Sequence, residues 1–343
     1  MHLIINPSDI YFLTGVHSHD PGEILILLNA LDSTSRSSIP QNLAGMTDKV
    51  GIIFCDARTS ALFDSQKYQI IDDRKKWEEA FKQYPEVDTD PDFLTQTLRE
   101  KIEKYGVQLH MQKSPVTQSR IIKTPEEIQK LRESQRRNKL VYEQILPFLV
   151  PWVTEEEIAR RIQIFQLELG ASGPSFPPIV AFGENTAVPH HSPTERILRD
   201  GDVVLVDMWL IYQGYCSDMT RCFQVEKKEK IKEKREGSFD EIYGLLQDVT
   251  REIISWAKPG MKVAELDQRA REMLGDYEQY FTHSLGHGVG IDIHEAPWIS
   301  VRSDEVLQSG MIITIEPGIY LPGKYGARYE EMVVVDKNGL ILI

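Results

Sequence analysis

The chain has 343 residues, 41% of them hydrophobic, and a formal net charge of −13. This acidic balance argues against nucleic acid or an anionic membrane as a partner, because binding to phosphates requires a basic surface. The early apolar run Ile24–Leu28 is too short to span a bilayer, and three cysteines without framework spacing favour a reducing, cytoplasmic location.

The first 122 residues are predicted to form a small α/β domain. Short apolar runs at Glu23–Leu28 and Val50–Phe54 predict strands, and the periodicity of Lys76–Gln83 and Phe93–Tyr105 predicts amphipathic helices. The intervening segment Asn42–Lys49 is predicted to be a loop.

A second domain is predicted over residues 123–343, since the length of the chain fits two domains. The segment Thr-Pro-Glu-Glu at 124–127 combines an N-cap threonine, a proline at the first helical position and a glutamate at the third. It predicts a long helix to about Leu146, which Pro147 ends. Thr154–Glu157 repeats the capping pattern and predicts a second helix that ends near Leu169.

The rest of this domain alternates strands with two further helices. The helices are predicted at Phe239–Trp256 and Val263–Leu274, after a charged run at Glu226–Glu236 that we interpret as solvated. Strands are predicted at Ile179–Phe182, Val203–Tyr212, Tyr215–Val225, Met311–Ile315 and Arg328–Val335. Helices that alternate with antiparallel hairpins predict an α+β fold for this domain.

Two aspartates stand where a strand should be apolar. Asp207 lies inside VVLVDMWLI, and Asp218 follows beyond the turn signal Gln213-Gly214. If the hairpin centres on Tyr212-Gln213, the two aspartates lie directly opposite each other, roughly 5 Å apart. Like charges at this distance repel, and a shared proton or a cation between them is the usual remedy. The alternative for Asp207 is a carboxylate bonded to backbone amides inside the fold.

Two glutamates occupy similar positions. Glu316 ends the apolar strand MIITI, and Glu330 lies in GARYEEMVVV with the same strand parity as Arg328. A salt bridge to Arg328 is the alternative explanation for Glu330. Glu331 has the opposite parity and is predicted to be a solvated surface acid.

Three histidines fall within the stretch HSLGHGVGIDIHEAP. Its glycines disfavour a helix and therefore the HExxH type of zinc site. On an extended backbone His283 and His287 share a face, whereas His294 needs a bend or bulge to join them. One such histidine alone would be explained by core packing, but His190 and His191 in PHHSP enlarge the set. Carboxylates with imidazoles suit Mn²⁺, Fe²⁺, Co²⁺ or Zn²⁺, and two cations bridged by carboxylates would relieve the repulsion.

The chain from residue 124 onward resembles the superfamily of methionine aminopeptidase, aminopeptidase P and prolidase, which has the pita-bread fold. The motifs that carry the resemblance occur in the order PHHSP, VLVD, GYCSDMTR, HSLGHGVGIDIHEAP, ITIEPGIY and GARYEE. The earlier segments IYFLTG and CDARTSALF resemble the creatinase-like N-terminal domain of aminopeptidase P and prolidase, which methionine aminopeptidases lack. The resemblance implies a pita-bread catalytic domain at 123–343 after a creatinase-like α/β domain at 1–122.

The resemblance also implies a metal-ligand set. The implied ligands are Asp207, Asp218, His287, Glu316 and Glu330, with Asp218 and Glu330 bridging two metals. Two divalent ions are expected, with Mn²⁺ as the first choice and Co²⁺, Zn²⁺ or Fe²⁺ as alternatives.

A catalytic role is implied for a second, overlapping set of residues: His190, His283, His294, Glu316 and Arg328. In the superfamily, the residue that matches Glu316 is the general base for a metal-bridging hydroxide. The match for His294 contacts the substrate carbonyl, and the match for His190 assists near the scissile nitrogen. His283 matches a substrate-facing histidine, and Arg328 with Tyr320 matches residues that support the metal-binding aspartate.

The implied activity is hydrolysis of Xaa-Pro bonds at peptide N-termini, as in aminopeptidase P, by a homodimer. One alternative is a prolidase restricted to Xaa-Pro dipeptides. A non-catalytic binding protein or a creatinase-type amidinohydrolase on the same fold is disfavoured, because all five ligands are present.

The chain departs from the family pattern at Trp209, where a small residue, mostly glycine, usually stands two positions after the first aspartate. Trp209 shares strand parity with Asp207. It is expected either to pack in an altered core or to narrow the substrate pocket.

Overall fold

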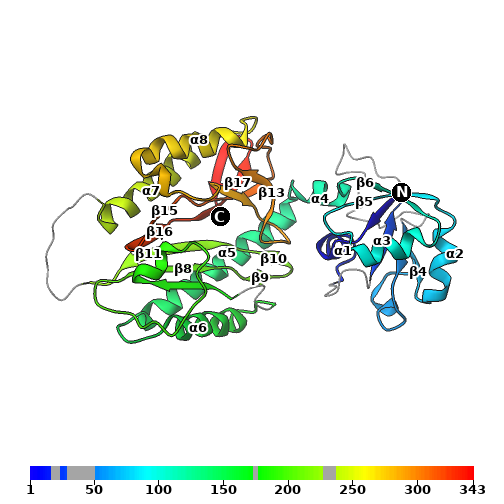
Figure 1. The fold of residues 1–343 in the computed structure, drawn as a ribbon, viewed down its shortest axis with the longest axis horizontal. Coiled ribbons are helices and arrows are strands. Elements are labelled where there is room, and N and C mark those ends of the chain that lie inside the picture. Colours follow the sequence, from blue (N-terminus) through cyan, green and yellow to red (C-terminus); the bar gives the residue numbers. More distant parts are fainter. Residues whose placement is uncertain (17–23, 29–50, 173–176, 227–236) are drawn as a thin grey trace. The chain divides into compact units, whose positions relative to one another are not determined.

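The computed structural model describes residues 1–16, 24–28, 51–172, 177–226 and 237–343, in two compact units, Met1–Arg120 and Ile121–Ile343 (Figure 1). The predicted loop Asn42–Lys49 and the charged run from residue 227 to 236 lie outside the described residues. Among the described helices, none is long and apolar enough to cross a membrane.

The first unit is built on one mixed six-stranded sheet. Its strands are, in pairing order, β4 (Tyr68–Ile71), β3 (Gly51–Phe54), β2 (Leu25–Leu28), β1 (His2–Ile4), β5 (Glu86–Thr89) and β6 (Gln108–Met111). Its helices are α1 (Pro7–Thr14), α2 (Trp77–Phe81), α3 (Gln96–Glu103) and α4 (Pro115–Arg120). The predicted strands are confirmed where they are described, and both predicted helices are shorter than expected. The second of them, α3, begins only after Thr95, whose hydroxyl caps it.

The second unit begins with the two helices that the capping patterns predict. α5 (Pro125–Ile145) and α6 (Glu155–Glu168) each follow a threonine whose side chain accepts a hydrogen bond from the amide three residues on. In α5 the Glu127 carboxylate also accepts from the Thr124 amide at 2.7 Å, which completes the capping box. The later helices α7 (Phe239–Trp256) and α8 (Val263–Leu274) have the predicted bounds.

Two main antiparallel sheets lie between these helices. One contains β11 (Met219–Gln224), β8 (Val203–Met208) and β7 (Ile179–Phe182). The other contains, in pairing order, β13 (Glu295–Ile299), β12 (Gly286–Gly288), β14 (Ile312–Ile315), β17 (Glu331–Asp336) and β18 (Gly339–Leu342). Two hairpins complete the unit: β9 (Ile211–Tyr212) with β10 (Tyr215–Cys216), and β15 (Gly318–Leu321) with β16 (Tyr325–Arg328).

Each pair of helices packs against one of these sheets. α5 and α6 form an apolar cluster with β7 and β8 that includes Ile158 and Val206. α7 and α8 form a second cluster with β14 and β17 that includes Ile253 and Ile313. In Figure 1 the strands of the second unit therefore lie between two helix pairs. The predicted α+β architecture is confirmed.

The predicted register of the hairpin that carries the two aspartates was wrong. β11 pairs with β8 so that Asp207 lies opposite Thr220, not Asp218. The turn centres on Gln213-Gly214, with φ values of 50° and 78°, instead of on Tyr212-Gln213. A tight two-residue turn of this kind needs positive φ at both central positions, and glycine meets that need at the second. Because the turn lies one residue later than predicted, the residue that pairs with Asp207 lies two residues later, at Thr220 instead of Asp218.

Both long strands predicted for this hairpin are also interrupted. β8 ends at Met208 and the chain resumes pairing only in β9. In the gap the Ser217 amide donates to the Leu210 carbonyl at 2.9 Å, and the Ser217 hydroxyl accepts from the Leu210 amide at 3.1 Å. Asp218 therefore stands in the break between β10 and β11.

Glu331 is buried, so its prediction as a solvated surface acid was wrong. Its side chain in β17 lies 2.5 Å from Arg221 Nη2 and accepts from the Tyr329 hydroxyl at 2.8 Å. Strand parity correctly separated Glu331 from Glu330, but both faces of β17 are covered. The opposite parity of Glu331 therefore directs its carboxylate into an ion pair with Arg221 and not into solvent.

Candidate active site

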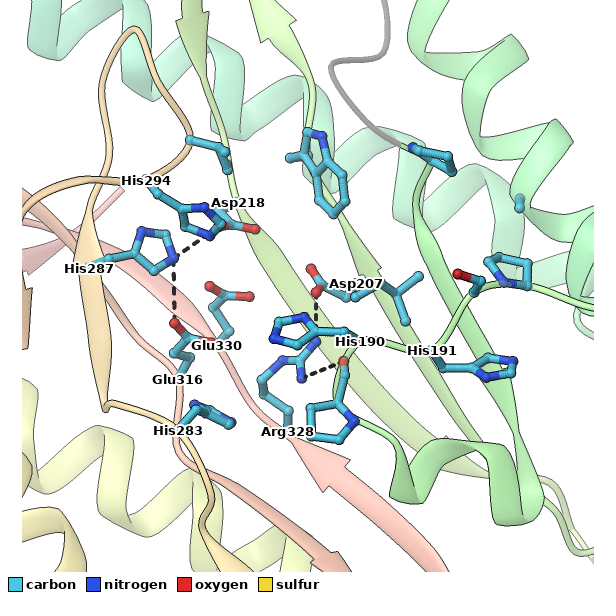
Figure 2. A pocket seen from close by; sticks show the side chains of 18 of the residues that line it. His190, His191, Asp207, Asp218, His283, His287, His294, Glu316, Arg328 and Glu330 are labelled. Carbon is cyan, nitrogen blue, oxygen red and sulfur yellow. Dashed lines mark hydrogen bonds and ion pairs between the residues drawn. The ribbon is translucent and has the colours of Figure 1, made fainter. Parts of the chain in front are cut away.

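One cavity of about 830 Å³ in the second unit gathers the predicted site residues. All nine of them line it: His190, Asp207, Asp218, His283, His287, His294, Glu316, Arg328 and Glu330. Figure 2 shows their side chains reaching from different strands and loops toward a common centre.

Asp218, His287 and Glu330 form the tightest part of this set, and their potential ligand atoms all lie within 4.8 Å of one another. The His287 Nδ1 donates to the Gly288 carbonyl at 3.0 Å. Burial lowers the pKa of His287 to about 3, so the ring is neutral and Nε2 carries a lone pair. That nitrogen lies 3.5 Å from Asp218 Oδ2 and 3.4 Å from Glu316 Oε1. Three acceptor atoms that face one another are an arrangement that a divalent cation stabilises.

Asp207 and Glu316, the other two predicted ligands, lie beside this tight group. Glu316 directly follows β14, and its amide donates to the Leu285 carbonyl at 2.8 Å. Asp207 Oδ2 accepts from Arg328 Nη2 at 2.6 Å. Its Oδ1 is buried and has no hydrogen-bond partner among the described residues. An orphaned carboxylate oxygen at the wall of a cavity fits a metal ligand, because buried polar atoms otherwise find a partner.

The acids at the centre raise one another's pKa values. Burial, followed by the charge of Asp207, raises the pKa of Glu330 to about 8. Burial and the charge of Glu330 raise the pKa of Asp218 and of Glu316 well above their ordinary values. Four carboxyl groups in one buried site cannot all ionise without a compensating cation. The donor set and its charge therefore fit divalent metal ions with oxygen and nitrogen ligands.

The metal-free protein is expected to lose stability as the pH rises from 7 to 8. The raised pKa values mean that the folded chain holds carboxyl protons that the unfolded chain, with a Glu pKa of about 4.3, has already lost. The pKa values of His283 and His287 are lowered to about 3, so these two histidines make the protein more stable as the pH rises. Their effect is confined to pH values below the unfolded histidine pKa of about 6.5, and it does not act between pH 7 and pH 8.

Urea unfolding of chelator-treated and Mn²⁺-loaded protein at the two pH values measures this effect. The free energy of unfolding is expected to fall between pH 7 and pH 8 in the metal-free protein. This decrease is expected to disappear when bound metal replaces the carboxyl protons. A metal-free protein that is equally stable at pH 7 and pH 8 would contradict the charge balance described above.

Arg328 links Asp207 to His283 through a chain of hydrogen bonds. Its guanidinium, at the end of β16, donates to Asp207 and also to the Tyr320 hydroxyl at 2.7 Å. The Tyr320 hydroxyl lies 2.9 Å from His283 Nε2, and His283 Nδ1 lies 2.8 Å from the Ser284 carbonyl. Both nitrogens of His283 are therefore engaged within the protein, and its contact with a substrate stays a prediction.

His294 reaches the centre through a bend in the chain between β12 and β13, one of the two features that its odd spacing predicts. The register of β12 against β13 shifts between His287 and Gly288. The His294 ring centroid lies 4.4 Å from that of His287 and 6.1 Å from the half-exposed Trp298. Burial lowers the pKa of His294, which favours the neutral imidazole that can donate to a developing oxyanion.

Trp209 also lines the cavity, directly after the end of β8. Its backbone carbonyl accepts from Gln166 Nε2 at 2.6 Å, which holds this stretch against α6. Trp209 therefore forms part of the cavity wall, and its narrowing of the substrate pocket stays a prediction.

Two buried polar residues that support the centre were not predicted. Thr220 Oγ1 donates to Glu330 Oε2 at 2.7 Å. Gln135 binds the backbone of Asp218 on both sides, donating to its carbonyl at 2.9 Å and accepting from its amide at 3.2 Å. Both left a signal in the sequence. Thr220 shares strand parity with Asp218, and Gln135 lies on the buried stripe of α5 together with Leu131.

Comparison with known proteins agrees with this geometry. Residues 129–337 match Peptidase_M24, described as metallopeptidase family M24. An uncharacterized peptidase of Methanocaldococcus jannaschii is 34% identical over 271 residues, which cover 77% of this chain and 74% of that protein. The Xaa-Pro dipeptidase of Pyrococcus furiosus is 38% identical over 223 residues, 64% of this chain and 62% of the relative's length. An uncharacterized peptidase of Bacillus subtilis, 36% identical over 232 residues, is likewise matched over only 64% of its length.

Solved structures extend the likeness to both units. The prolidase from Pyrococcus furiosus superposes with a TM-score of 0.84 at 28% identity, covering 99% of this chain and 94% of that one. The X-Pro aminopeptidase from Thermotoga maritima gives a TM-score of 0.75 at 26% identity, covering 92% and 94%. These matches confirm the pita-bread fold and the resemblance to aminopeptidase P and prolidase. The chain belongs to metallopeptidase family M24.

Proposed function

We propose that this protein hydrolyses the Xaa-Pro bond at the N-terminus of peptides with two bound divalent metals. The observation that carries the proposal is the buried set of facing acceptors, in which the neutral His287 Nε2 points at Asp218 and Glu316 inside one cavity. The proposed ligands are Asp207, Asp218, His287, Glu316 and Glu330, with Asp218 and Glu330 as bridges. Mn²⁺ is the proposed metal, with Co²⁺, Zn²⁺ or Fe²⁺ as alternatives.

The residues around these ligands have distinct proposed tasks. The chemistry that a divalent metal supplies in such a site is polarisation of a carbonyl and activation of water. Glu316, whose carboxylate lies 3.4 Å from His287 Nε2 at the centre of the site, accepts the proton of the attacking water. His294 donates to the carbonyl oxygen as it gains charge, and His190 serves the departing proline nitrogen, which needs a proton. Arg328 holds the Asp207 carboxylate in place.

The cavity favours substrates that continue beyond the proline. A dipeptide carries its carboxylate directly on the proline, so a dipeptidase needs a cation nearby. Two cations line the cavity among the described residues, and one of them, Arg328, is fully engaged within the protein. The other, Arg160 of α6, is mostly exposed and pairs with Glu156. The cavity lining extends along α6 through Ala159 and Gln163, which supports a substrate that continues beyond the proline, as in an aminopeptidase P.

Restriction to dipeptides is the second candidate, and the relatives' names favour it. Proteins named Xaa-Pro dipeptidase match this chain at 38% and 39% identity. In that case Arg160 is the proposed anchor of the substrate carboxylate.

Three peptides separate these possibilities: Ala-Pro, its amide Ala-Pro-NH₂, and Ala-Pro-Ala, each incubated with chelator-stripped, Mn²⁺-reloaded protein. Mass spectrometry measures the release of alanine together with the second product of Xaa-Pro cleavage, which is proline, Pro-NH₂ or Pro-Ala respectively. Cleavage of the amide and the tripeptide supports the aminopeptidase, whereas cleavage of Ala-Pro alone supports the dipeptidase. Failure on all three with metal bound would overturn the proposed function. Sedimentation of the same sample tests the proposed homodimer.

Replacing Trp209 with glycine is expected to broaden the range of accepted substrates. Removal of an indole from the cavity wall makes space next to Asp207, so peptides with large first residues should gain most. The measurement is kcat/KM across Xaa-Pro-Ala peptides from glycine to tryptophan. Trp152→Gly is the matched control, because Trp152 is exposed, has a φ of 82° and does not line the cavity. Unchanged relative rates in Trp209→Gly would reject the prediction.

A further inference from the structure

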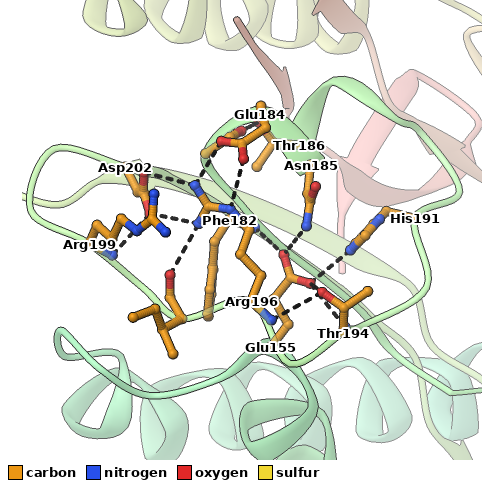
Figure 3. Close-up of polar contacts among 12 residues, drawn as sticks. Glu155, Phe182, Glu184, Asn185, Thr186, His191, Thr194, Arg196, Arg199 and Asp202 are labelled. Atoms are coloured by element: carbon orange, nitrogen blue, oxygen red, sulfur yellow. Dashed lines mark hydrogen bonds and ion pairs between the residues drawn. The ribbon is translucent and has the colours of Figure 1, made fainter. Parts of the chain in front are cut away.

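Glu155 is a completely buried acid that the proposed mechanism leaves unused. It is the first residue of α6 and has an exposed fraction of 0%. Figure 3 shows its carboxylate surrounded by donors. Oε1 accepts from the Phe182 amide at 2.8 Å and from Asn185 Nδ2 at 2.9 Å. Oε2 lies 2.8 Å from His191 Nε2 and accepts from the Thr194 amide at 3.0 Å and the Thr194 hydroxyl at 2.7 Å.

These donors stand around one turn in the segment between β7 and β8, the turn at residues 189–193 that carries PHHSP and lines the cavity. Phe182 and Asn185 precede the turn, His191 lies within it, and Thr194 directly follows it. One carboxylate therefore ties both sides of this turn to the start of α6. Five hydrogen bonds to a charged group offset the cost of its burial and hold the loop strongly, because bonds to a charged group are stronger than those between neutral groups.

The residue presented by this loop is His190. Its side chain is exposed, and among the described residues no hydrogen bond holds its ring. His190 points toward Asp207 in Figure 2, whereas the adjacent His191 points away from the centre, toward Glu155. The position of His190 therefore depends on the backbone that His191 and Thr194 anchor.

We propose that Glu155 is a positioning residue, which holds His190 in place at the candidate active site through His191 and Thr194. Glu155 does not line the cavity and touches no reacting group. The inference rests on the proposed function, in which His190 serves the departing nitrogen. Glutamine at this position keeps the shape but turns one oxygen into an amide donor that faces other donors, so the loop loses part of its anchor.

A double-mutant cycle tests the proposal with Ala-Pro-Ala as the substrate. Glu155→Gln is expected to lower kcat/KM by about 10- to 100-fold, since a small misplacement of a catalytic group costs up to about 100-fold. His190→Ala is expected to lower it at least as much. In the His190→Ala background, Glu155→Gln should have almost no further effect, because the group that it positions is absent. The metal content of each variant should equal that of the wild type.

His191→Ala removes a single anchor and supplies a second cycle if Glu155→Gln does not fold. Glu157→Gln is the matched control: Glu157 is in the same helical turn, bonds Arg161 and lies outside the cavity lining. Its kcat/KM should stay within about twofold of the wild type, as expected for a partly exposed pair outside the cavity.

The outcomes separate this inference from the function on which it rests. Additive losses in both cycles, or a loss of bound metal in Glu155→Gln, would show that Glu155 acts on the fold in general and would overturn the positioning role. A wild-type protein that binds metal but cleaves none of the three peptides would overturn the proposed function, and the inference with it.

Discussion

Replacing Glu330 with glutamine is expected to strip the protein of bound metal and to lower Xaa-Pro cleavage by about 1000-fold or more. Glu330 is buried, and its carboxylate lies within 4.8 Å of the ligand atoms of Asp218 and His287. An amide offers one neutral oxygen where a bridging carboxylate offers two charged ones. Elemental mass spectrometry after dialysis against Mn²⁺ gives the metal content per chain, and the Ala-Pro-Ala assay gives kcat/KM.

The adjacent acid provides the control for this experiment. Glu331 is also buried but faces Arg221 and Tyr329 on the other side of β17. Glu331→Gln removes the same charge from the next residue and is expected to lower stability while leaving the metal in place. Equal metal content in the Glu330 and Glu331 variants would show that Glu330 is not a ligand.

The parts of the fold that could be predicted are those whose signals are local. The capping patterns at Thr124 and Thr154 act within one helical turn, so α5 and α6 begin where the sequence indicates. α7 and α8 end at Trp256 and Leu274 as predicted. The hairpin register was wrong because a difference of a single residue in the turn, at Gln213-Gly214, changes every pair along β8 and β11.

The candidate site could be predicted for a different reason. Asp207 and Glu316 interrupt or end apolar strands, where a charged group has a high free-energy cost unless it has a partner. Such residues can be recognised without knowledge of their neighbours. Glu155 could not be recognised in this way, because an acid in the first turn of a helix is ordinary and its burial depends on a loop that folds back from residues 183–196. Local patterns thus identify the acids at the centre, whereas the residues that position them depend on tertiary contacts.

Replacing Arg328 with alanine is expected to lower the free energy of unfolding by about 3–5 kcal/mol in the metal-free protein, the usual cost of removing one partner of a buried ion pair. Arg328 is 3% exposed and donates to Asp207 at 2.6 Å, to Tyr320 at 2.7 Å and to Thr220 at 2.9 Å. Without it, Asp207 stays buried with one oxygen already lacking a hydrogen-bond partner among the described residues. Urea unfolding of the chelator-treated proteins measures the loss.

The same substitution also tests whether Asp207 faces a metal. With Mn²⁺ bound, the loss caused by Arg328→Ala should be smaller, because a cation beside Asp207 takes over part of the compensation that the guanidinium provided. Arg251→Ala is the control, since Arg251 is mostly exposed in a helical pair with Asp248 and should cost no more than about 1 kcal/mol with or without metal. A loss for Arg328→Ala that is unchanged by metal would place the bound ion away from Asp207. The metal group would then consist of the acids around His287 alone.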